Sequence, residues 1–170
     1  KLSATLAIST VAVGWAFASF RTGQLCVSLG TRYSRAWQYR AAPLLVVECG
    51  ALAGMLIAAA CGHILLFAFA FFLLGACVGL TYASSLFYSL ADGVSGRGRM
   101  SGIHEAVLGS GGMLGPLVSG IVAQWIHIRA PFLIAACLFC VAIGLQLALY
   151  VRFRLRAARH IPIQQTEGRA

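Results

Sequence analysis

Two titratable side chains, His104 and Glu105, stand next to each other near the start of a long apolar stretch. Histidine changes its charge near neutral pH, and a carboxylate beside it can take up or release a proton. The pair could act as acid and base in an enzyme, bind a proton that is coupled to transport, or gate a passage. The structural alternative for Glu105 is a favourable charge in the first turn of a helix, where the helix dipole is positive.

Further groups that could support enzyme chemistry are few. Asp92 is the nearest other carboxylate, but the sequence has no His-x-x-x-His motif and no paired carboxylates. The CLFC segment at 137–140 has the spacing of a metal or redox motif, yet no other ligand type lies near it. Cysteine is also a common small buried residue in apolar surroundings. We therefore predict no enzyme activity, no metal and no cofactor; a polytopic membrane enzyme that uses Asp92, His104 and Glu105 is the weaker alternative.

The composition is that of a chain that faces lipid. Hydrophobic residues make up 60% of the 170 residues and charged residues 10%, and the mean hydropathy is +0.87. A soluble domain has about one-quarter charged residues. The net charge of +9 does not indicate nucleic-acid binding, because the basic residues form short clusters between apolar runs and leave no phosphate-binding face. The lipid bilayer is therefore the expected partner of most of the surface.

Several stretches are long and apolar enough to cross a bilayer, which takes about 20 residues. They cover about 3–29, 42–60, 64–91, 101–126 and 131–151. We expect an all-α integral membrane protein, with a bundle of five transmembrane helices over 1–151 and a basic tail at 152–170. The chain begins at Lys1 without a methionine, and an odd number of spans suits an even-numbered bundle that lacks its first part, so we also expect a fragment.

The basic residues predict the orientation of the chain. One group occupies the loops after the first and third spans and the tail: Arg32, Arg35, Arg40, Arg97, Arg99, Arg152, Arg154, Arg156, Arg159 and Arg169. The opposite face of the bundle has only Lys1 and Arg129. Because basic loops stay in the cytoplasm, we place the first group and the C-terminus there. The expected location is the plasma membrane of a bacterium, its inner membrane.

Polar residues gather on one face of three spans, at about 100° per residue. The richest face belongs to the third span and consists of Tyr82, Ser85, Tyr88, Ser89 and Asp92. Arg21 and Gln24 lie on such a face in the first span. These side chains are costly against lipid and suit a water-filled cavity that binds a small molecule. The alternative is that the hydroxyls bond back to their own helix. The second and fifth spans have no comparable face apart from Glu48, and we expect them to be outer helices.

Of all residues in the chain, Arg21 has the highest free-energy cost of burial in a membrane. If its helix ends near Leu29, Arg21 lies about 12 Å from the cytoplasmic end, and Glu48 in the next span lies at about 9 Å. Similar depths favour an Arg21–Glu48 ion pair, with Glu105 as a competing partner. The alternative is that the helix ends near Phe20 and the Arg21 side chain reaches the interface.

Small residues also mark helix contacts. GALAG at 50–54 and GACVG at 75–79 have the Gly-x-x-x-Gly spacing and are expected to pack against neighbouring helices. The glycines of the fourth span, together with Pro116, are expected to form a close-packed, bendable seam, because neighbouring helices can satisfy backbone groups that a proline leaves free.

Two motifs and the topology resemble the C-terminal half of a major facilitator superfamily transporter, from helix eight to helix twelve of a twelve-helix bundle. The loop GTRYSRAWQYR is similar to the family's Gly-x-x-x-Asp-Arg-x-Gly-Arg-Arg signature. Gly30 and Arg35 match the glycine and first arginine, while Ser34 stands in place of the aspartate and Trp37 in place of the second glycine. The missing aspartate removes the usual charge-relay role of this loop.

The second motif is GGMLGPLVSG at 111–120, which resembles the Gly-x-x-x-Gly-Pro-x-x-Gly-Gly motif of proton-coupled exporters. The matching positions are Gly111, Gly115, Pro116 and Gly120, and Ser119 replaces one glycine.

The resemblance implies secondary transport of a small solute by alternating access, with proton-coupled efflux as one form of it. It also implies that the first, third and fourth spans line a central cavity opposite the N-terminal half of the same protein. The expected cavity-lining residues are Arg21, Gln24, Tyr82, Ser85, Tyr88 and Ser89. The expected gating or proton-coupling residues are Glu48, Asp92, His104 and Glu105. A non-transporting receptor or assembly subunit with the same fold is the alternative.

Overall fold

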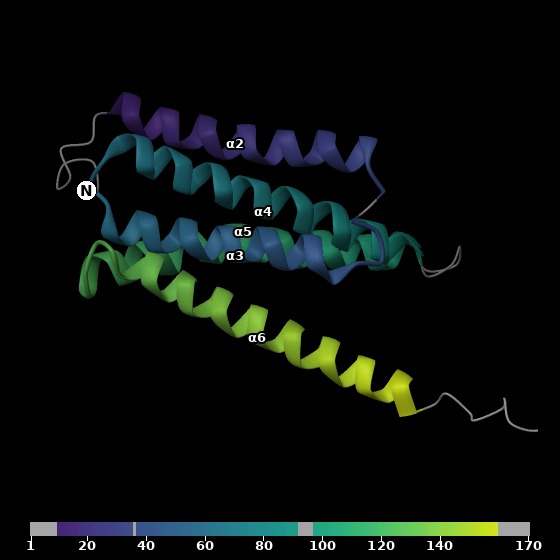
Figure 1. Cartoon of the computed structure of the whole chain (residues 1–170). Coiled ribbons are helices and arrows are strands. Elements are labelled where there is room, and N and C mark those ends of the chain that lie inside the picture. Colours follow the sequence, from purple (N-terminus) through teal and green to yellow (C-terminus); the bar gives the residue numbers. More distant parts are fainter. Residues whose placement is uncertain (1–9, 36, 92–96, 160–170) are drawn as a thin grey trace, which may run out of the picture.

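The computed structural model describes residues 10–35, 37–91 and 97–159 of the chain. These residues form five α-helices and, within the described ranges, no strand. The helices are α2 (Thr10–Tyr33), α3 (Ala41–Ala60), α4 (Ile64–Ala91), α5 (Arg97–Trp125) and α6 (Ala130–Arg159). They run up and down along one another as an elongated bundle (Figure 1). The predicted all-helical fold with five helices is confirmed.

Four of the helices are long and apolar enough to cross a membrane over the residues that are described. These spans are Ala41–Ala60, Ile64–Ser89, Gly98–Trp125 and Ala130–Leu155. The described part of α2 is less apolar because Arg21 and Gln24 lie within it. Large hydrophobic side chains such as Trp15, Leu65 and Val107 are more than half exposed, which suits a surface that contacts lipid. The chain is therefore an integral membrane protein.

Helix α4 is the centre of the bundle and packs against α2, α3 and α5, while α6 packs against α3 and α5. In Figure 1 α4 lies between α2 on one side and α3 on the other. Two clusters of buried apolar residues hold these helices together: Ala16, Ala58, Phe67 and Ala70 in one, and Ala51, Leu74 and Cys77 in the other. Most of these side chains are small, so the helix axes can approach closely.

The glycines of α4 allow the closest of these approaches. A Cβ atom at Gly75 would collide with the backbone carbonyl of Phe20 in α2, and one at Gly79 would lie 2.9 Å from the carbonyl oxygen of Gln24. Gly54 of α3 faces the backbone of α4 in the same way, with a carbonyl oxygen 2.9 Å from its hypothetical Cβ. The expected packing role of the 75–79 and 50–54 segments is confirmed at these three glycines.

Helix α5 does not show the expected close-packed seam. Its glycines stand free of other groups, and an added Cβ would meet no atom within 4 Å at Gly109, Gly111, Gly112, Gly115 or Gly120. The helix touches α4 and α6 but leaves most of its surface exposed. Pro116 lies inside the helix without ending it. No helix of the described chain covers that side of α5, so the close-packed seam stays a prediction.

The turn between α2 and α3 is fastened to α4. Tyr39 has a positive φ of 57°, and its backbone N–H donates to the hydroxyl of Tyr88 at 3.0 Å. The Trp37 indole donates to the Thr31 carbonyl at 3.2 Å, and the Trp37 and Tyr39 rings both meet Phe87 edge-on. Side chains that contact one another in this way offset the cost of the left-handed backbone at Tyr39.

The last helix is longer than the expected span. Helix α6 continues from Ala130 to Arg159, so its final turns occupy the start of the segment that was expected to be a tail at 152–170. Residues 160–170 lie outside the described part of the chain.

Candidate functional site

Four of the expected site residues meet where α4 and α5 lie side by side. Tyr82 and Ser85 are three residues apart on α4 and therefore share one face of the helix. The Tyr82 hydroxyl donates to Glu105 Oε1 at 3.0 Å, and Ser85 Oγ lies 2.5 Å from His104 Nε2. The Tyr82 and His104 rings also pack together, with centroids 5.6 Å apart. We call this group the Tyr82–Glu105 cluster.

The hydrogen bonds of the cluster fit one tautomer of the His104 ring. With the Ser85 hydroxyl donating to the Tyr82 carbonyl at 3.0 Å, Ser85 Oγ accepts from His104 in the tautomer that carries its proton on Nε2. In that tautomer Nδ1 has a lone pair. That Nδ1 atom is buried and has no hydrogen-bond partner among the described residues. It lies 3.7 Å from Glu105 Oε1, which is beyond hydrogen-bond distance.

This arrangement leaves room for one more proton. An unprotonated Nδ1 and a carboxylate oxygen are both acceptors, so they repel each other at short distance. A proton added between them, on Nδ1 or on Glu105, turns the contact into an attraction. The Glu105 side chain is 54% exposed while that of His104 is 14% exposed. The carboxylate therefore lies at the surface of the described chain, while the imidazole stays within the cluster.

The remaining hydroxyls of the α4 face do not join the cluster. Ser89 donates to the carbonyl of Leu86 in its own helix at 2.9 Å, so the alternative of bonding back to the helix holds for this residue. Tyr88 is bonded to the turn at Tyr39. Asp92 lies outside the described residues. Ser89 and Tyr88 therefore form their hydrogen bonds outside the Tyr82–Glu105 cluster, and their expected place in a substrate cavity stays a prediction.

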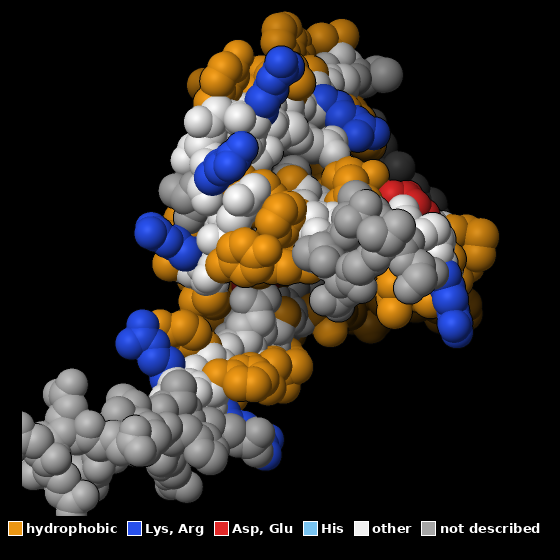
Figure 2. All heavy atoms as spheres, turned by 90° about the vertical axis from the view of Figure 1, so that its right-hand side faces the viewer, with side chains coloured by type: hydrophobic (Ala, Val, Ile, Leu, Met, Phe, Trp, Pro, Cys, Tyr) orange, Lys and Arg blue, Asp and Glu red, His pale blue; other side chains and the backbone are white. Residues whose placement is uncertain are grey.

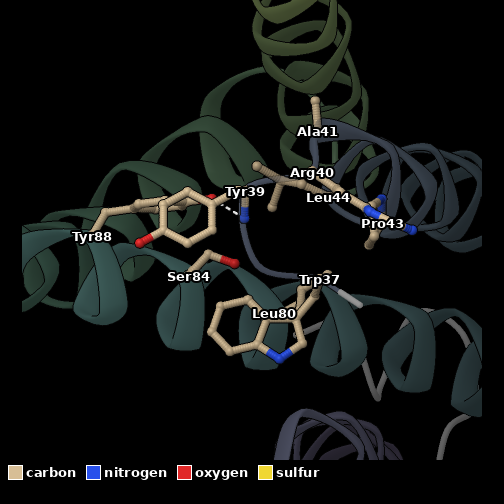
Figure 3. A pocket seen from close by; sticks show the side chains of 9 residues that line it. All are labelled: Trp37, Tyr39, Arg40, Ala41, Pro43, Leu44, Leu80, Ser84 and Tyr88. Atoms are coloured by element: carbon tan, nitrogen blue, oxygen red, sulfur yellow. Dashed lines mark hydrogen bonds between the residues drawn. The ribbon is translucent and has the colours of Figure 1, made fainter. Parts of the chain in front are cut away.

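Tyr88 instead lines a separate cavity of about 310 Å³ next to the α2–α3 turn. Figure 3 shows Tyr88 and Ser84 of α4 facing Tyr39 and Trp37 of the turn, with Arg40 at the start of α3. Sequence reasoning missed this cavity, because the turn could not be placed against α4. The aromatic residues of the turn were the available signal.

Arg21 and Glu48 do not form the expected ion pair. The Arg21 guanidinium donates to the side chain of Gln24 at 2.9 Å, one turn along the same helix, and is exposed. Glu48 lies on α3, and α4 separates that helix from α2 (Figure 1). Similar depth along the membrane did not bring the two charges to the same side of α4. The alternative of a helix that ends near Phe20 is also wrong, since α2 continues to Tyr33.

Glu48 has a partner that sequence reasoning missed. The side-chain amide of Gln146 on α6 donates to Glu48 Oε1 at 2.5 Å. Glu48 is only 6% exposed, and its Oε2 has no hydrogen-bond partner among the described residues. A lone glutamine in the apolar run of α6 was the signal, since polar side chains in membrane helices bond across to a neighbour. We call these two residues the Glu48–Gln146 pair.

The motif residues lie at the surface of this chain. Gly30 is in the last turns of α2 with open space around it, and its carbonyl accepts from the Ser34 N–H at 3.0 Å. Arg35 is exposed in the turn that follows. Gly111, Gly115, Pro116 and Gly120 lie on the uncovered side of α5. Within the described ranges, no group of three or more His, Cys, Asp or Glu side chains could hold a metal ion.

The two ends of the bundle differ strongly in charge. Figure 2 looks onto the end where α2, α4 and α6 finish and α3 and α5 begin, and basic side chains are spread across it. Six arginines whose side chains are described belong to this end: Arg32, Arg35, Arg40, Arg99, Arg152 and Arg154. At the opposite end, the described residues include a single arginine, Arg129, which reaches the Ala60 carbonyl at 3.4 Å.

Fold and polar cluster together define a polytopic α-helical membrane protein with titratable groups between two of its spans. The family model of the Major Facilitator Superfamily matches residues 1–170, so the chain belongs to this superfamily of transporters. No curated protein and no solved structure was found to match the chain. The family's members are transporters and not enzymes, in agreement with the absence of an enzyme motif in the sequence.

Proposed function

We propose that the chain is part of a secondary active transporter that moves a small solute by alternating access. The observation that carries the proposal is the Tyr82–Glu105 cluster, which places a histidine, a carboxylate and two hydroxyls inside two apolar spans. Polar groups inside a membrane are costly and are typical of substrate and ion pathways. Membership of the superfamily supports the same activity.

The transport is proposed to be coupled to protons. Support comes from the contact of His104 Nδ1 with Glu105 Oε1, where one proton converts repulsion into attraction. Protonation would tighten α5 against α4, because Tyr82 donates to the same Glu105 oxygen and Ser85 contacts the opposite nitrogen of the His104 ring. Loss of the proton would loosen that contact. A proton could therefore bias the relative position of two helices, as a coupled transporter requires.

The chain is proposed to supply helices eight to twelve of the transporter, with the N-terminal half of the same protein as its partner. The uncovered side of α5 supports this assignment, since Gly111, Gly115 and Gly120 present backbone to a helix that could pack closely there. The similarity of the 111–120 segment to exporter motifs favours efflux over uptake. Arg21 and Gln24 would line the cavity as a bonded pair rather than as an ion pair with Glu48.

The orientation is proposed from the charge of the two ends. The basic end carries the start of α3, the start of α5 and the end of α6, and basic ends remain in the cytoplasm. The C-terminus would then be cytoplasmic, and the expected location remains a bacterial inner membrane.

Solute flux in proteoliposomes tests the proposal. The complete transporter is reconstituted, a proton gradient is imposed, and a panel of cationic amphipathic dyes, sugars and organic acids is assayed for movement. We expect gradient-driven flux of at least one class, with release of protons on the opposite side. Ser110→Ala is the control variant and should transport as the wild type does, because the Ser110 hydroxyl bonds only to the Ala106 carbonyl of its own helix. Saturable binding of a panel member without any flux would contradict transport and favour a receptor.

A further inference from the structure

A second cavity lies at the basic end of the bundle, between the start of α3 and the last turns of α6. Its volume is about 470 Å³, and Arg40 and Arg154 both line it. Neither guanidinium has a carboxylate partner in the described part of the chain. Glu48 is bonded to Gln146, and Glu105 belongs to the Tyr82–Glu105 cluster. Two positive charges therefore line one cavity without a negative charge to balance them.

Aromatic residues contact the Arg154 side chain and fix the backbone next to Arg40. The Arg154 guanidinium lies over the Tyr150 ring, 5.3 Å from its centroid. Arg40 follows Tyr39, whose backbone is fixed by the hydrogen bond to Tyr88 and by edge-on contacts with Phe87 and Tyr88. Both Tyr39 and Tyr150 line the cavity as well. Positively charged groups that are fixed in advance lose less conformational freedom when they bind an anion.

The start of α3 adds further donors on the same side. Ala41 and Ala42 line the cavity and open the helix, where backbone N–H groups have no partner within the helix. Arg40 makes no side-chain capping bond there, and the first turn holds no acidic residue. The helix dipole is positive at this point and adds to the charge of the two arginines.

The far wall of the cavity is apolar. Leu45 and Leu147 line it, and they lie about 7 Å and 10 Å deeper along their helices than Arg40 and Arg154, from a rise of about 1.5 Å per residue. Charge and aromatic rings are thus found at the interfacial depth, and leucines at the depth of the hydrocarbon. This order matches that of a phospholipid, with its phosphate at the interface and its acyl chains below.

We propose that this cavity binds the headgroup phosphate of an anionic phospholipid in the cytoplasmic leaflet. The two guanidiniums would hold the phosphate oxygens, because the planar fork of arginine matches them in pairs. Leu45 and Leu147 would contact the upper part of the acyl chains. A free phosphate ion would use the arginines but gain nothing from the leucines, so the apolar wall favours the lipid. The bound lipid would join α3 to α6 next to the Glu48–Gln146 pair.

Native mass spectrometry of the purified protein tests the proposal, with phosphatidylglycerol and phosphatidylcholine titrated in separate series. We expect one saturable phosphatidylglycerol per chain and no matching phosphatidylcholine. Arg40→Gln combined with Arg154→Gln should weaken phosphatidylglycerol binding by about tenfold or more, the order expected when two basic side chains near an anionic membrane are lost. Arg40→Lys combined with Arg154→Lys should bind more phosphatidylglycerol than the double glutamine variant but less than the wild type, because lysine keeps the charge without the paired donors of arginine; this intermediate binding guards against a loss caused by misfolding.

The matched control is Arg32→Gln combined with Arg99→Gln, which removes the same charge from the same end but away from the cavity. We expect this control to bind phosphatidylglycerol as the wild type does. An equal loss in the control would overturn the proposal in favour of diffuse attraction to the whole basic end. Displacement of the lipid by equimolar inorganic phosphate would overturn it in favour of a free-anion site. Unchanged binding in the double glutamine variant would overturn it outright.

Discussion

Glu48 and Glu105 are both carboxylates of membrane-spanning helices, and the structure gives them opposite surroundings. Glu48 is buried in the interior between α3 and α6, where one amide donor meets it. Glu105 is half exposed, accepts from Tyr82, and stands beside an imidazole that can gain a proton. From the sequence alone, Glu48 and Glu105 were equivalent candidates for gating or proton coupling. Their neighbours separate them, because only Glu105 is both exposed on the described chain and next to a histidine.

The difference extends to the helices around them. In the interior that contains Glu48, the helix backbones approach one another closely, for example at Gly75 and Phe20. The α4–α5 contact that holds Glu105 includes the hydrogen bonds of the Tyr82–Glu105 cluster and is less extensive than the contacts of α4 with α2 and α3. A contact with few packed side chains can open and close at lower cost than a close-packed one. We infer that the interior of α2, α3, α4 and α6 acts as a rigid frame and that α5 moves against it.

The largest effect on stability is expected for Glu48→Ala. The substitution leaves a cavity and an unpaired Gln146 amide, which together should lower the free energy of unfolding by about 2 kcal/mol. Unfolding in mixed micelles, followed by circular dichroism, measures this change. Glu105→Ala is the matched control and should stay within about 0.5 kcal/mol of the wild type, as is usual for exposed sites. Equal losses in both variants would remove the distinction between the two carboxylates.

A smaller loss of stability is expected for Gln146→Leu. The leucine fills similar space but donates no hydrogen bond to Glu48, and bonds between membrane helices contribute about 0.6 kcal/mol on average. We expect a loss of about 1 kcal/mol in the same unfolding assay. Gln124→Leu on α5 serves as the control, because Gln124 is exposed. A stable Gln146→Leu variant would mean that the Glu48–Gln146 pair does not hold α3 to α6.

The smallest effect on stability, but a clear one on transport, is expected for Ser85→Ala. His104 Nε2 loses its hydrogen-bond partner, so the imidazole is no longer held in the orientation that directs Nδ1 to Glu105. Unfolding should change by less than about 1 kcal/mol, while proton-driven flux should fall severalfold. Ser89→Ala removes a hydroxyl that is bonded only to its own helix and should leave flux unchanged. If both serine variants transported equally, the ring orientation would have no role.

The fold was predictable because it depends on composition and on local spacing. Apolar runs of membrane length predicted the helices, and the Gly-x-x-x-Gly spacing predicted the helix contacts at Gly54, Gly75 and Gly79. The meeting of Tyr82 and Ser85 with His104 and Glu105 was partly predictable, since each residue lay on a polar face of its own span. Which span faces which could not be read from one sequence, because hydrophobic periodicity does not specify neighbours. The expected Arg21–Glu48 ion pair failed for this reason.

The features that could not be predicted from the sequence have a second cause in common. Gln146, Ser84 and the aromatic turn each look unremarkable in isolation, and their roles arise only from partners on other helices. The glycines of α5 were given a packing role within the bundle because their spacing suits a helix contact. Spacing shows that a helix can be approached closely, but it does not say which chain supplies the approaching helix.

The central claim is that Glu105, and not Glu48, takes part in proton coupling. Transport in proteoliposomes with and without an imposed pH gradient, compared for Glu105→Gln and Glu48→Gln, tests it directly. Glutamine keeps the size of both side chains and cannot exchange the proton. The account predicts that Glu48→Gln responds to the gradient as the wild type does, while Glu105→Gln exchanges solute but ignores the gradient. A Glu105→Gln variant with the wild-type rate and the wild-type response to pH would contradict it.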